Sequence, residues 1–230
     1  MPFGHDSTKK APNTLRISLT NAGGFPISTQ DEKNKLLLSF VQDNDIDVPM
    51  WTETDKHWDS LPFKDRLPAR TNGWFESLHM TTAYYKTFPG ATRQQYGGVS
   101  LWSTGQAGHR IKDAGFDLAS GTDRFGLGRW AWTRYQGRNG VSLRVVVAYR
   151  PVRNKRGVMS VWNQQKLYWE KHNDDTDPIV KFTEDLAAEV TQWIDQGDQI
   201  VLGLDVNEDV RKGVFQKAMS NVGLVGLIIK

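Results

Sequence analysis

The sequence predicts an α/β protein in which two mixed β-sheets pack face to face with helices outside. Helical patterns occur early and late in the chain, and apolar runs typical of strands lie between them. Two of these runs flank the turn signal Asn139-Gly140, which indicates a β-hairpin. A purely parallel, doubly wound sheet would not contain such a hairpin, so we expect two sheets.

The first half of the chain opens with a strand, a helix and a second strand. Their patterns cover residues 15–20, 30–43 and 46–53. Thr29 or Ser28 is expected to cap the helix, because acidic residues follow in its first turn. A further strand is expected at residues 97–104.

The second half contains the hairpin, two helices, a strand and a last helix. The hairpin strands are expected at 129–135 and 141–149, and the helices near 158–172 and 178–196. The last two elements are expected at 199–204 and near 212–221. One stripe of the longer helix is apolar at a spacing close to the helical period and carries Ile179, Phe182, Leu186, Val190 and Trp193.

Composition and length are those of an ordinary globular domain. The chain has 230 residues, and we expect a flexible tail over residues 1–13 and a single domain over 14–230. The net charge of +3 permits an anionic partner without demanding one. The absence of cysteine excludes a disulfide framework and thiolate metal sites. Because no apolar run is long enough to span a membrane and no signal-peptide core is present, we expect an intracellular protein, nuclear or cytoplasmic.

Three of the predicted strands end at small polar or acidic residues. Asp205 follows an apolar run and Asn207 comes two residues later, on the same side of an extended chain. Asn21 and Glu53 follow the first two strands. These carboxylates and amides could bind a cation or orient a water against a phosphate. The alternative for each is ordinary, since Asp and Asn favour turns and an acid at a sheet rim is often only solvated.

Other candidates flank the strand ends. Tyr149 closes a strand, where tyrosine is also common in the core, and Arg150 beside it could meet a phosphate. His57 follows the second strand closely and could line a site, although none of the histidines has a spacing that predicts zinc. Arg153 belongs to a basic, aromatic segment, residues 129–156. That segment fits a nucleic-acid surface or an alternating strand pattern with its arginines outward.

Taken in order, these motifs resemble the endonuclease/exonuclease/phosphatase family, whose members include pancreatic deoxyribonuclease. The resemblance is carried by Asn21, Glu53, Tyr149-Arg-Pro and Gly203-Leu-Asp-Val-Asn207, and spans about residues 15–225. Each motif is weak alone, and the ordered series is more specific. The stretch Thr52-Glu-Thr-Asp-Lys-His-Trp58 is most similar to retrotransposon-type and abasic-site endonuclease domains.

The resemblance implies a four-layer α/β sandwich that hydrolyses phosphate esters, most readily in DNA, with Mg²⁺ or Mn²⁺. By that resemblance Glu53 binds the metal, and Asn21 and Asn207 help place the metal, its waters and the phosphate. Asp205 would position or deprotonate the attacking water, and Tyr149 would hydrogen-bond the scissile phosphate. The expected substrate contacts are Arg150, Arg153 and His57.

The chain departs from the family pattern after Asp205. Family members add a strand with another Asp and end in a Ser-Asp-His-type motif, whereas here no acid or histidine follows Asp209. The sequence therefore resembles a member shortened at its C-terminus, with an incomplete sandwich and an exposed sheet edge. The apolar ending 224–229 would then form a substitute strand, pair two copies into a homodimer, or meet a completing chain.

Three functions remain open on the sequence. The first is a metal-dependent DNA endonuclease. The second is a truncated relative that has lost catalysis and binds nucleic acid or a protein. The third is a phosphatase acting on a small phosphorylated lipid or sugar, although the Arg-rich hairpin favours a polymer.

Overall fold

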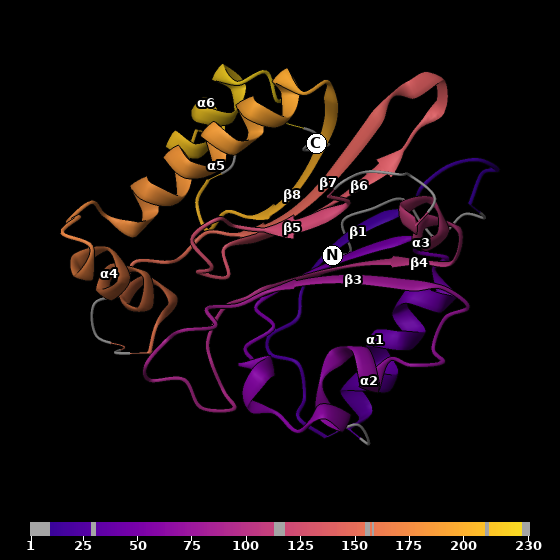
Figure 1. Ribbon diagram of the computed structural model, residues 1–230, viewed down its shortest axis with the longest axis horizontal. Helices are drawn as coiled ribbons and strands as arrows, with labels where there is room; N and C mark the ends of the chain where they lie inside the picture. The colour runs from indigo at the N-terminus through magenta and orange to yellow at the C-terminus, as the bar shows by residue number, and fades with distance from the viewer. Residues whose placement is uncertain are drawn as a thin grey trace.

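The computed structural model describes residues 10–28, 31–112, 118–154, 157, 159–209 and 212–226. Its strands form two four-stranded sheets that face each other (Figure 1). The first sheet has the order β1-β2-β4-β3 and is built from β1 (Ile17–Asn21), β2 (Val48–Thr52), β3 (Leu78–Ala83) and β4 (Val99–Thr104). The second has the order β5-β6-β7-β8 and is built from β5 (Ser120–Thr122), β6 (Trp130–Gln136), β7 (Ser142–Tyr149) and β8 (Asp198–Asp205).

Each sheet contains one parallel pair of strands at one side. β1 runs parallel to β2 with Asn21 opposite Thr52, and β7 runs parallel to β8 with Tyr149 opposite Asp205. The other pairings of the described strands are antiparallel. Because parallel strands end at the same edge of a sheet, the carboxyl ends of these four strands gather the candidate site residues at one rim.

Helices cover the outer face of each sheet and both ends of the sandwich (Figure 1). The first sheet is covered by α1 (Glu32–Asp43) and α2 (Leu67–Arg70), and the second by α5 (Pro178–Asp195) and α6 (Val214–Asn221). α3 (Gly105–Lys112) and α4 (Val161–Lys171) lie at opposite ends. Short 3-10 helices occur at Trp58–Ser60, Phe63–Asp65 and Arg138–Gly140. The predicted two-sheet α/β sandwich is therefore confirmed.

The alternation of side chains along β2 places one core on each side of the first sheet. Met50 lies in the core between the two sheets, and its neighbour Trp51 lies in the core beneath α1. The apolar stripe of α5 packs on the outer face of the second sheet, where Phe182 and Leu186 are fully buried. Burial on both faces explains why β2 reads as a continuous apolar run in the sequence.

Several local expectations are corrected by the structure. Asp31, rather than Ser28, caps α1, because its carboxylate accepts the Lys33 amide at 2.9 Å. Thr29, the other predicted cap, lies outside the described residues. The sequence reasoning missed β3, β5 and α3. The last begins at a glycine and contains a second one, so its sequence carries no helix signal.

The basic segment 129–156 turns most of its described arginines inward, against the expectation of an outward basic face. The hairpin register pairs Arg134 with Arg144 across β6 and β7, and Asp198 accepts a hydrogen bond from each at 2.8 Å. Arg144 also lies over the ring of Trp132, 3.9 Å from its centroid. A single buried carboxylate therefore neutralises two like charges that face each other on adjacent strands.

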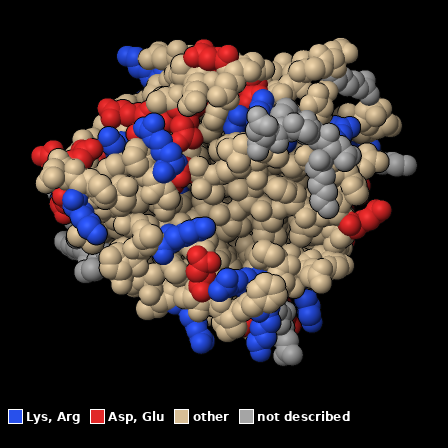
Figure 2. Space-filling view, in the orientation of Figure 1, with Lys and Arg blue, Asp and Glu red and all other residues tan. Residues whose placement is uncertain are grey.

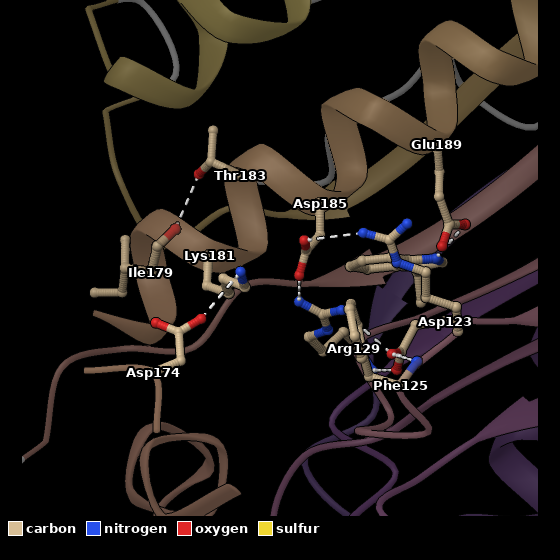
Figure 3. Close-up of polar contacts among 11 residues, drawn as sticks. Asp123, Phe125, Arg129, Asp174, Ile179, Lys181, Thr183, Asp185 and Glu189 are labelled. Carbon is tan, nitrogen blue, oxygen red and sulfur yellow. Dashed lines mark hydrogen bonds and ion pairs between the residues drawn. The ribbon is translucent and has the colours of Figure 1, made fainter. Parts of the chain in front are cut away.

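Arg129 is the most enclosed of these arginines. Its side chain is fully buried and forms ion pairs with Asp123 at 3.3 Å and with Asp185 of α5 at 2.8 Å (Figure 3). Glu189, one turn further along α5, accepts the indole N–H of Trp130 at 3.0 Å. This network joins the loop before β6 to the helix that covers the sheet. Its arginine is therefore not available to a nucleic acid.

The two ends of the chain are described only in part. Lys10, within the predicted tail, pairs with Asp47 at 2.8 Å, and residues 1–9 lie outside the described residues. Of the apolar ending, residues 224–226 form no strand, and residues 227–230 lie outside the described residues. Among the helices that the structure describes, none combines the length and the apolar character that crossing a membrane requires.

Candidate functional site

The two sheets are joined at their shared rim by a hydrogen bond between candidate residues. The amide nitrogen of Asn21, the last residue of β1, donates to Oδ2 of Asp205, the last residue of β8, at 3.0 Å. The prediction that these residues act together requires such proximity. The contact places an amide and a carboxylate side by side on strands from different sheets.

The orientation of the Asn21 side chain is fixed from its other end. Its Oδ1 accepts the backbone N–H of Gly23 at 2.9 Å, so the amide nitrogen is the group directed toward Asp205. The loop after Asn21 continues the pairing with the end of β2, because the N–H of Ala22 donates to the carbonyl of Thr52 at 2.8 Å. The position of Asn21 is therefore set by the regular pairing of β1 with β2.

Glu53 follows β2 directly and adopts an unusual backbone conformation. Its φ is +50°, and Asp55 and Asn207 have φ values of +52° and +51°. Among the described residues with positive φ, Glu53 is the only one that is not Gly, Asn or Asp, the types that tolerate this region best. The carbonyl of Glu53 accepts the N–H of Gly24 at 2.8 Å, which helps to hold this turn. Strained positions of this kind cluster at functional sites.

Burial and crowded negative charge set the ionisation of the rim residues. Burial raises the pKa of Asp205 above its ordinary value, and the carboxylate of Glu53 raises it further, whereas the hydrogen bond from Asn21 lowers it. Burial also raises the pKa of the Tyr149 phenol, with the Glu53 carboxylate as the next cause. Tyr149 is therefore a neutral hydrogen-bond donor at physiological pH, and Glu53 lies close to both groups.

Asp55 is a rim residue that the sequence reasoning missed. Its Oδ1 accepts the backbone N–H of Gly97 at 2.7 Å, and burial raises its pKa to about 6, against the lowering effect of that hydrogen bond. The charge of Glu53 contributes to the same rise. The available signal was its position two residues after Glu53, which places a second acid in the same turn.

Asn207 and Arg150 lie beside this cluster and are held by contacts of their own. The chain is no longer extended at Asn207, whose amide nitrogen donates to the carbonyl of Arg150 at 2.8 Å. Arg150 is buried, donates to the carbonyl of Val206 at 3.1 Å and pairs with Glu208 at 2.9 Å. Its guanidinium therefore holds the loop after β8 against the end of β7.

The remaining two predicted substrate residues lie further out. Arg153 has an exposed side chain that pairs with Asp177, the cap of α5. The Nε2 atom of His57 lies 2.9 Å from the carbonyl of Lys86, and its ring packs edge-on against Tyr84. None of the contacts described for either residue reaches Asn21, Glu53 or Asp205.

A hollow adjoins Tyr149. Its volume is about 360 Å³, and it is lined by apolar and aromatic side chains together with a smaller polar part: Tyr149, Tyr96, Val152, Met159, Val161, Asn154, Gly157 and Ser160. Tyr96 is 53% exposed and Val152 is 51% exposed, so this wall is apolar and open to solvent. A substrate whose phosphate lay against Tyr149 would have an aromatic surface next to it.

The rim residues fit a hard divalent cation. Glu53, Asp55 and Asp205 form no ion pair with any residue that the structure describes, and the charge of Glu53 raises the pKa of both Asp55 and Asp205. Carboxylate and amide oxygens are the ligands that Mg²⁺ and Mn²⁺ prefer. Within the described part of the chain, no three Asp, Glu or His side chains are grouped to hold a metal alone. A bound ion would therefore also need amide, water or phosphate oxygens.

Comparison with known proteins reveals similarity in structure but none in sequence. No family profile and no curated protein matches the chain. The structure is similar to the catalytic domain of human Nocturnin with bound sulfate, at a TM-score of 0.55 and 13% identity, covering 90% of this chain and 70% of that one. It is also similar to an AP endonuclease from Archaeoglobus fulgidus, at a TM-score of 0.50 and 14% identity, covering 91% and 70%.

A third similar structure is the beta toxin of Staphylococcus aureus, at a TM-score of 0.50 and 12% identity, covering 91% of this chain and 71% of that one. All three likenesses extend over nearly the whole chain, and their low identity limits them to the fold. Together with the order of the strands and the residues at their ends, they show that this chain has the deoxyribonuclease-I-like fold of the endonuclease/exonuclease/phosphatase family.

Proposed function

We propose that this protein is a metal-dependent phosphodiesterase and that its substrate is DNA. The observation that carries the proposal is the hydrogen bond between Asn21 and Asp205, with Glu53 and Tyr149 close enough to shift the ionisation of the same rim. Together these four residues supply the groups that hydrolysis of a phosphate ester needs at one place. These groups are a cation ligand, an acceptor for the proton of a water, and two neutral hydrogen-bond donors.

Each residue has a role that follows from its contacts. Asp205 accepts a proton from the attacking water, and its raised pKa makes the carboxylate a stronger base than an ordinary aspartate. Asn21 holds that carboxylate in place, and Tyr149 donates its phenol hydrogen to a phosphate oxygen. Glu53 would hold Mg²⁺ or Mn²⁺, which when bound supplies positive charge at the phosphate.

A polymeric substrate is favoured by the surroundings of Tyr149. The hollow lined by Tyr96 and Val152 offers a stacking surface of the kind that bases use. The face shown in Figure 2 carries Lys and Arg interspersed with Asp and Glu, so the support for DNA comes from the hollow.

A second candidate is a protein that has kept the fold and binds nucleic acid without cleaving it. The observation in its favour is that no three metal-ligating acids or histidines are grouped within the described residues. The two functions differ in whether the chain alone breaks a phosphodiester bond.

The test is nicking of supercoiled plasmid in the presence of Mg²⁺ or Mn²⁺. Glu53→Gln and Asp205→Asn preserve shape and remove one charge each, and the matched control is Glu76→Gln, an exposed acid distant from the rim. We expect the wild type and the control to nick plasmid, and the two rim variants to lose most of that activity. DNA binding without cleavage by the folded wild type would establish the second candidate instead.

A further inference from the structure

Lys33 reaches from the first turn of α1 to the loop that carries Asn21. Its ammonium donates to the carbonyl of Gly23 at 3.0 Å and to the carbonyl of Gly24 at 2.6 Å. An ammonium group has three donors, so two of them bridge consecutive carbonyls of one loop. Nothing in the sequence distinguishes this lysine from the helix formers around it.

These carbonyls belong to a turn that only glycine adopts readily. Gly23 and Gly24 have φ values of +53° and +83°. The N–H of Gly23 is the donor to Oδ1 of Asn21. Gly23 therefore links the two contacts, because its carbonyl accepts from Lys33 and its N–H donates to Asn21.

The loop has two sets of supports. Its N–H groups are tied to the end of β2, since Gly24 donates to the carbonyl of Glu53 at 2.8 Å and Phe25 to that of Thr54 at 2.9 Å. Its carbonyls at Gly23 and Gly24 are tied to Lys33. Without the lysine, these two peptide groups would keep their N–H contacts to the end of β2 and lose the contacts on their carbonyl side, so the glycine turn would be held less firmly.

We propose that Lys33 is a positioning residue of the rim, which fixes the Gly23-Gly24 turn and thereby holds Asn21 against Asp205. Three hydrogen bonds joined through the backbone of Gly23 support this role: Lys33 donates to the carbonyl of Gly23, the N–H of Gly23 donates to Asn21, and Asn21 donates to Asp205. The consequence for catalysis rests on the proposed phosphodiesterase function. The effect of Lys33 on the conformation of the loop does not depend on that function.

The experiment compares Lys33→Met with Lys35→Met. Methionine keeps the apolar stem of lysine and removes the ammonium, and Lys35 is an exposed residue of the same helix. Hydrogen–deuterium exchange of the peptide covering residues 19–27 and the side-chain amide resonances of Asn21 report on the loop. Plasmid nicking with Mn²⁺ gives kcat and KM, and thermal unfolding gives Tm.

For Lys33→Met we expect faster exchange in the loop, a shift of the Asn21 amide resonances and a fall in kcat of about 10- to 100-fold, because small misplacements of catalytic groups are costly. KM is expected to stay within about twofold, because the substrate contacts remain. Tm is expected to change little, because Gly23 is exposed and water can replace the ammonium. Lys35→Met should leave all five quantities at wild-type values.

Three results would overturn the proposal. Unchanged exchange and unchanged amide resonances would show that Lys33 does not hold the loop. A salt-dependent rise in KM at constant kcat would assign Lys33 to the substrate phosphate instead. A fall in kcat matched by a large loss of Tm would make the role a general structural one. If the wild type nicks nothing, the proposed function fails, and exchange and resonance data alone decide whether Lys33 fixes the turn.

Discussion

Asn21 and Asp205 lie 184 residues apart in the chain and are joined by a hydrogen bond of 3.0 Å between their side chains. Each closes a strand that runs parallel to its neighbour, one in each sheet. The bond therefore fixes the relative position of the two sheets at the rim where Glu53 and Tyr149 also lie. The geometry of the proposed site and the packing of the sheets therefore depend on each other at this point.

Replacing Asn21 with alanine should lower activity far more than stability. The variant loses the donor that holds the Asp205 carboxylate, and a displaced base costs about 100-fold in rate. The contact is exposed, so we expect the loss of stability to be about 1 kcal/mol or less. Plasmid nicking and urea unfolding measure the two quantities.

The matched control is Asn44→Ala. Asn44 likewise donates from its side-chain amide, in this case to the backbone carbonyl of Phe40, and it caps the C-terminal end of α1 away from the rim. This control should keep wild-type nicking. Equal losses of activity in the two variants would mean that the Asn21–Asp205 contact has no special part in the reaction.

The carboxyl group of Asp205 should titrate above the ordinary aspartate value of 3.8 in the metal-free protein. Burial and the charge of Glu53 both disfavour its ionised form. Glu53→Gln should therefore lower this pKa, and Asn21→Ala should raise it. Carbon-detected NMR titration in EDTA measures all three proteins, and shifts of the same sign in both variants would contradict this account.

Asp55 should make stability depend on pH in a direction opposite to that of a salt-bridged acid. Its pKa rises from 3.8 to about 6 in the folded protein, so its stabilising contribution is complete below 3.8 and is lost as pH rises through 6. Asp55→Asn cannot ionise. The stability of the wild type relative to this variant should thus fall between about pH 4 and 6 and stay level above about 7.

Urea unfolding of both proteins in EDTA tests this dependence. The chelator is needed because a bound cation would stabilise the ionised carboxylate and mask the effect. A relative stability that rises across the same interval would show that the hydrogen bond from Gly97, rather than burial, dominates the ionisation of Asp55.

The sequence predicted the strands that carry the site well because their signals are local. β1, β2, β7 and β8 are apolar runs with abrupt polar ends, and the Asn139-Gly140 turn has positive φ at both residues. What it could not provide is the contact of Lys33 with the Gly23 and Gly24 carbonyls. A lysine within a helical sequence pattern looks the same in the sequence whether its ammonium group is hydrated or bound to the carbonyls of a turn.

For the arginines of segment 129–156, the sequence allowed an interpretation that the structure corrects. Arg129, Arg144 and Arg150 were compatible with a surface for phosphate, yet each is buried and paired with a carboxylate. Their partners Asp123, Asp198 and Glu208 lie on other elements of the chain. The alternation of residues along a strand indicates which face of the sheet each side chain occupies. It does not reveal whether an oppositely charged side chain from another element lies on that face.

Arg129→Met should destabilise the protein strongly. The substitution leaves Asp123 and Asp185 as buried carboxylates without the cation between them, and such a loss costs about 3–5 kcal/mol. The comparison is Arg153→Met, which removes an exposed pair worth about 0–1 kcal/mol. Urea unfolding of both variants should rank them in that order. Near-equal losses would mean that water or a rearranged side chain replaces the Arg129 guanidinium.

A side chain at Gly203 would require Met50 to move, because Gly203 of β8 packs against Met50 of the first sheet. A Cβ atom placed there would lie 2.3 Å from the Cε of Met50, which is buried between the two sheets. Gly203→Ala should therefore destabilise the fold by about 1 kcal/mol, at the low end for overpacking, because the atoms it meets are the flexible end of Met50. Since Asp205 lies two residues further along the same strand, nicking should fall as well.

The double variant Gly203→Ala with Met50→Val tests the cause of that loss. Valine removes the Met50 atoms that the new methyl group would meet, so the double variant should be more stable than the sum of the two single changes predicts. Gly226→Ala is the control, because a Cβ atom at that position would have its nearest non-neighbouring atom 4.0 Å away. If the losses of stability in the double variant are additive, the contact with Met50 between the two sheets is not what makes Gly203→Ala destabilising. The cause would then lie within β8.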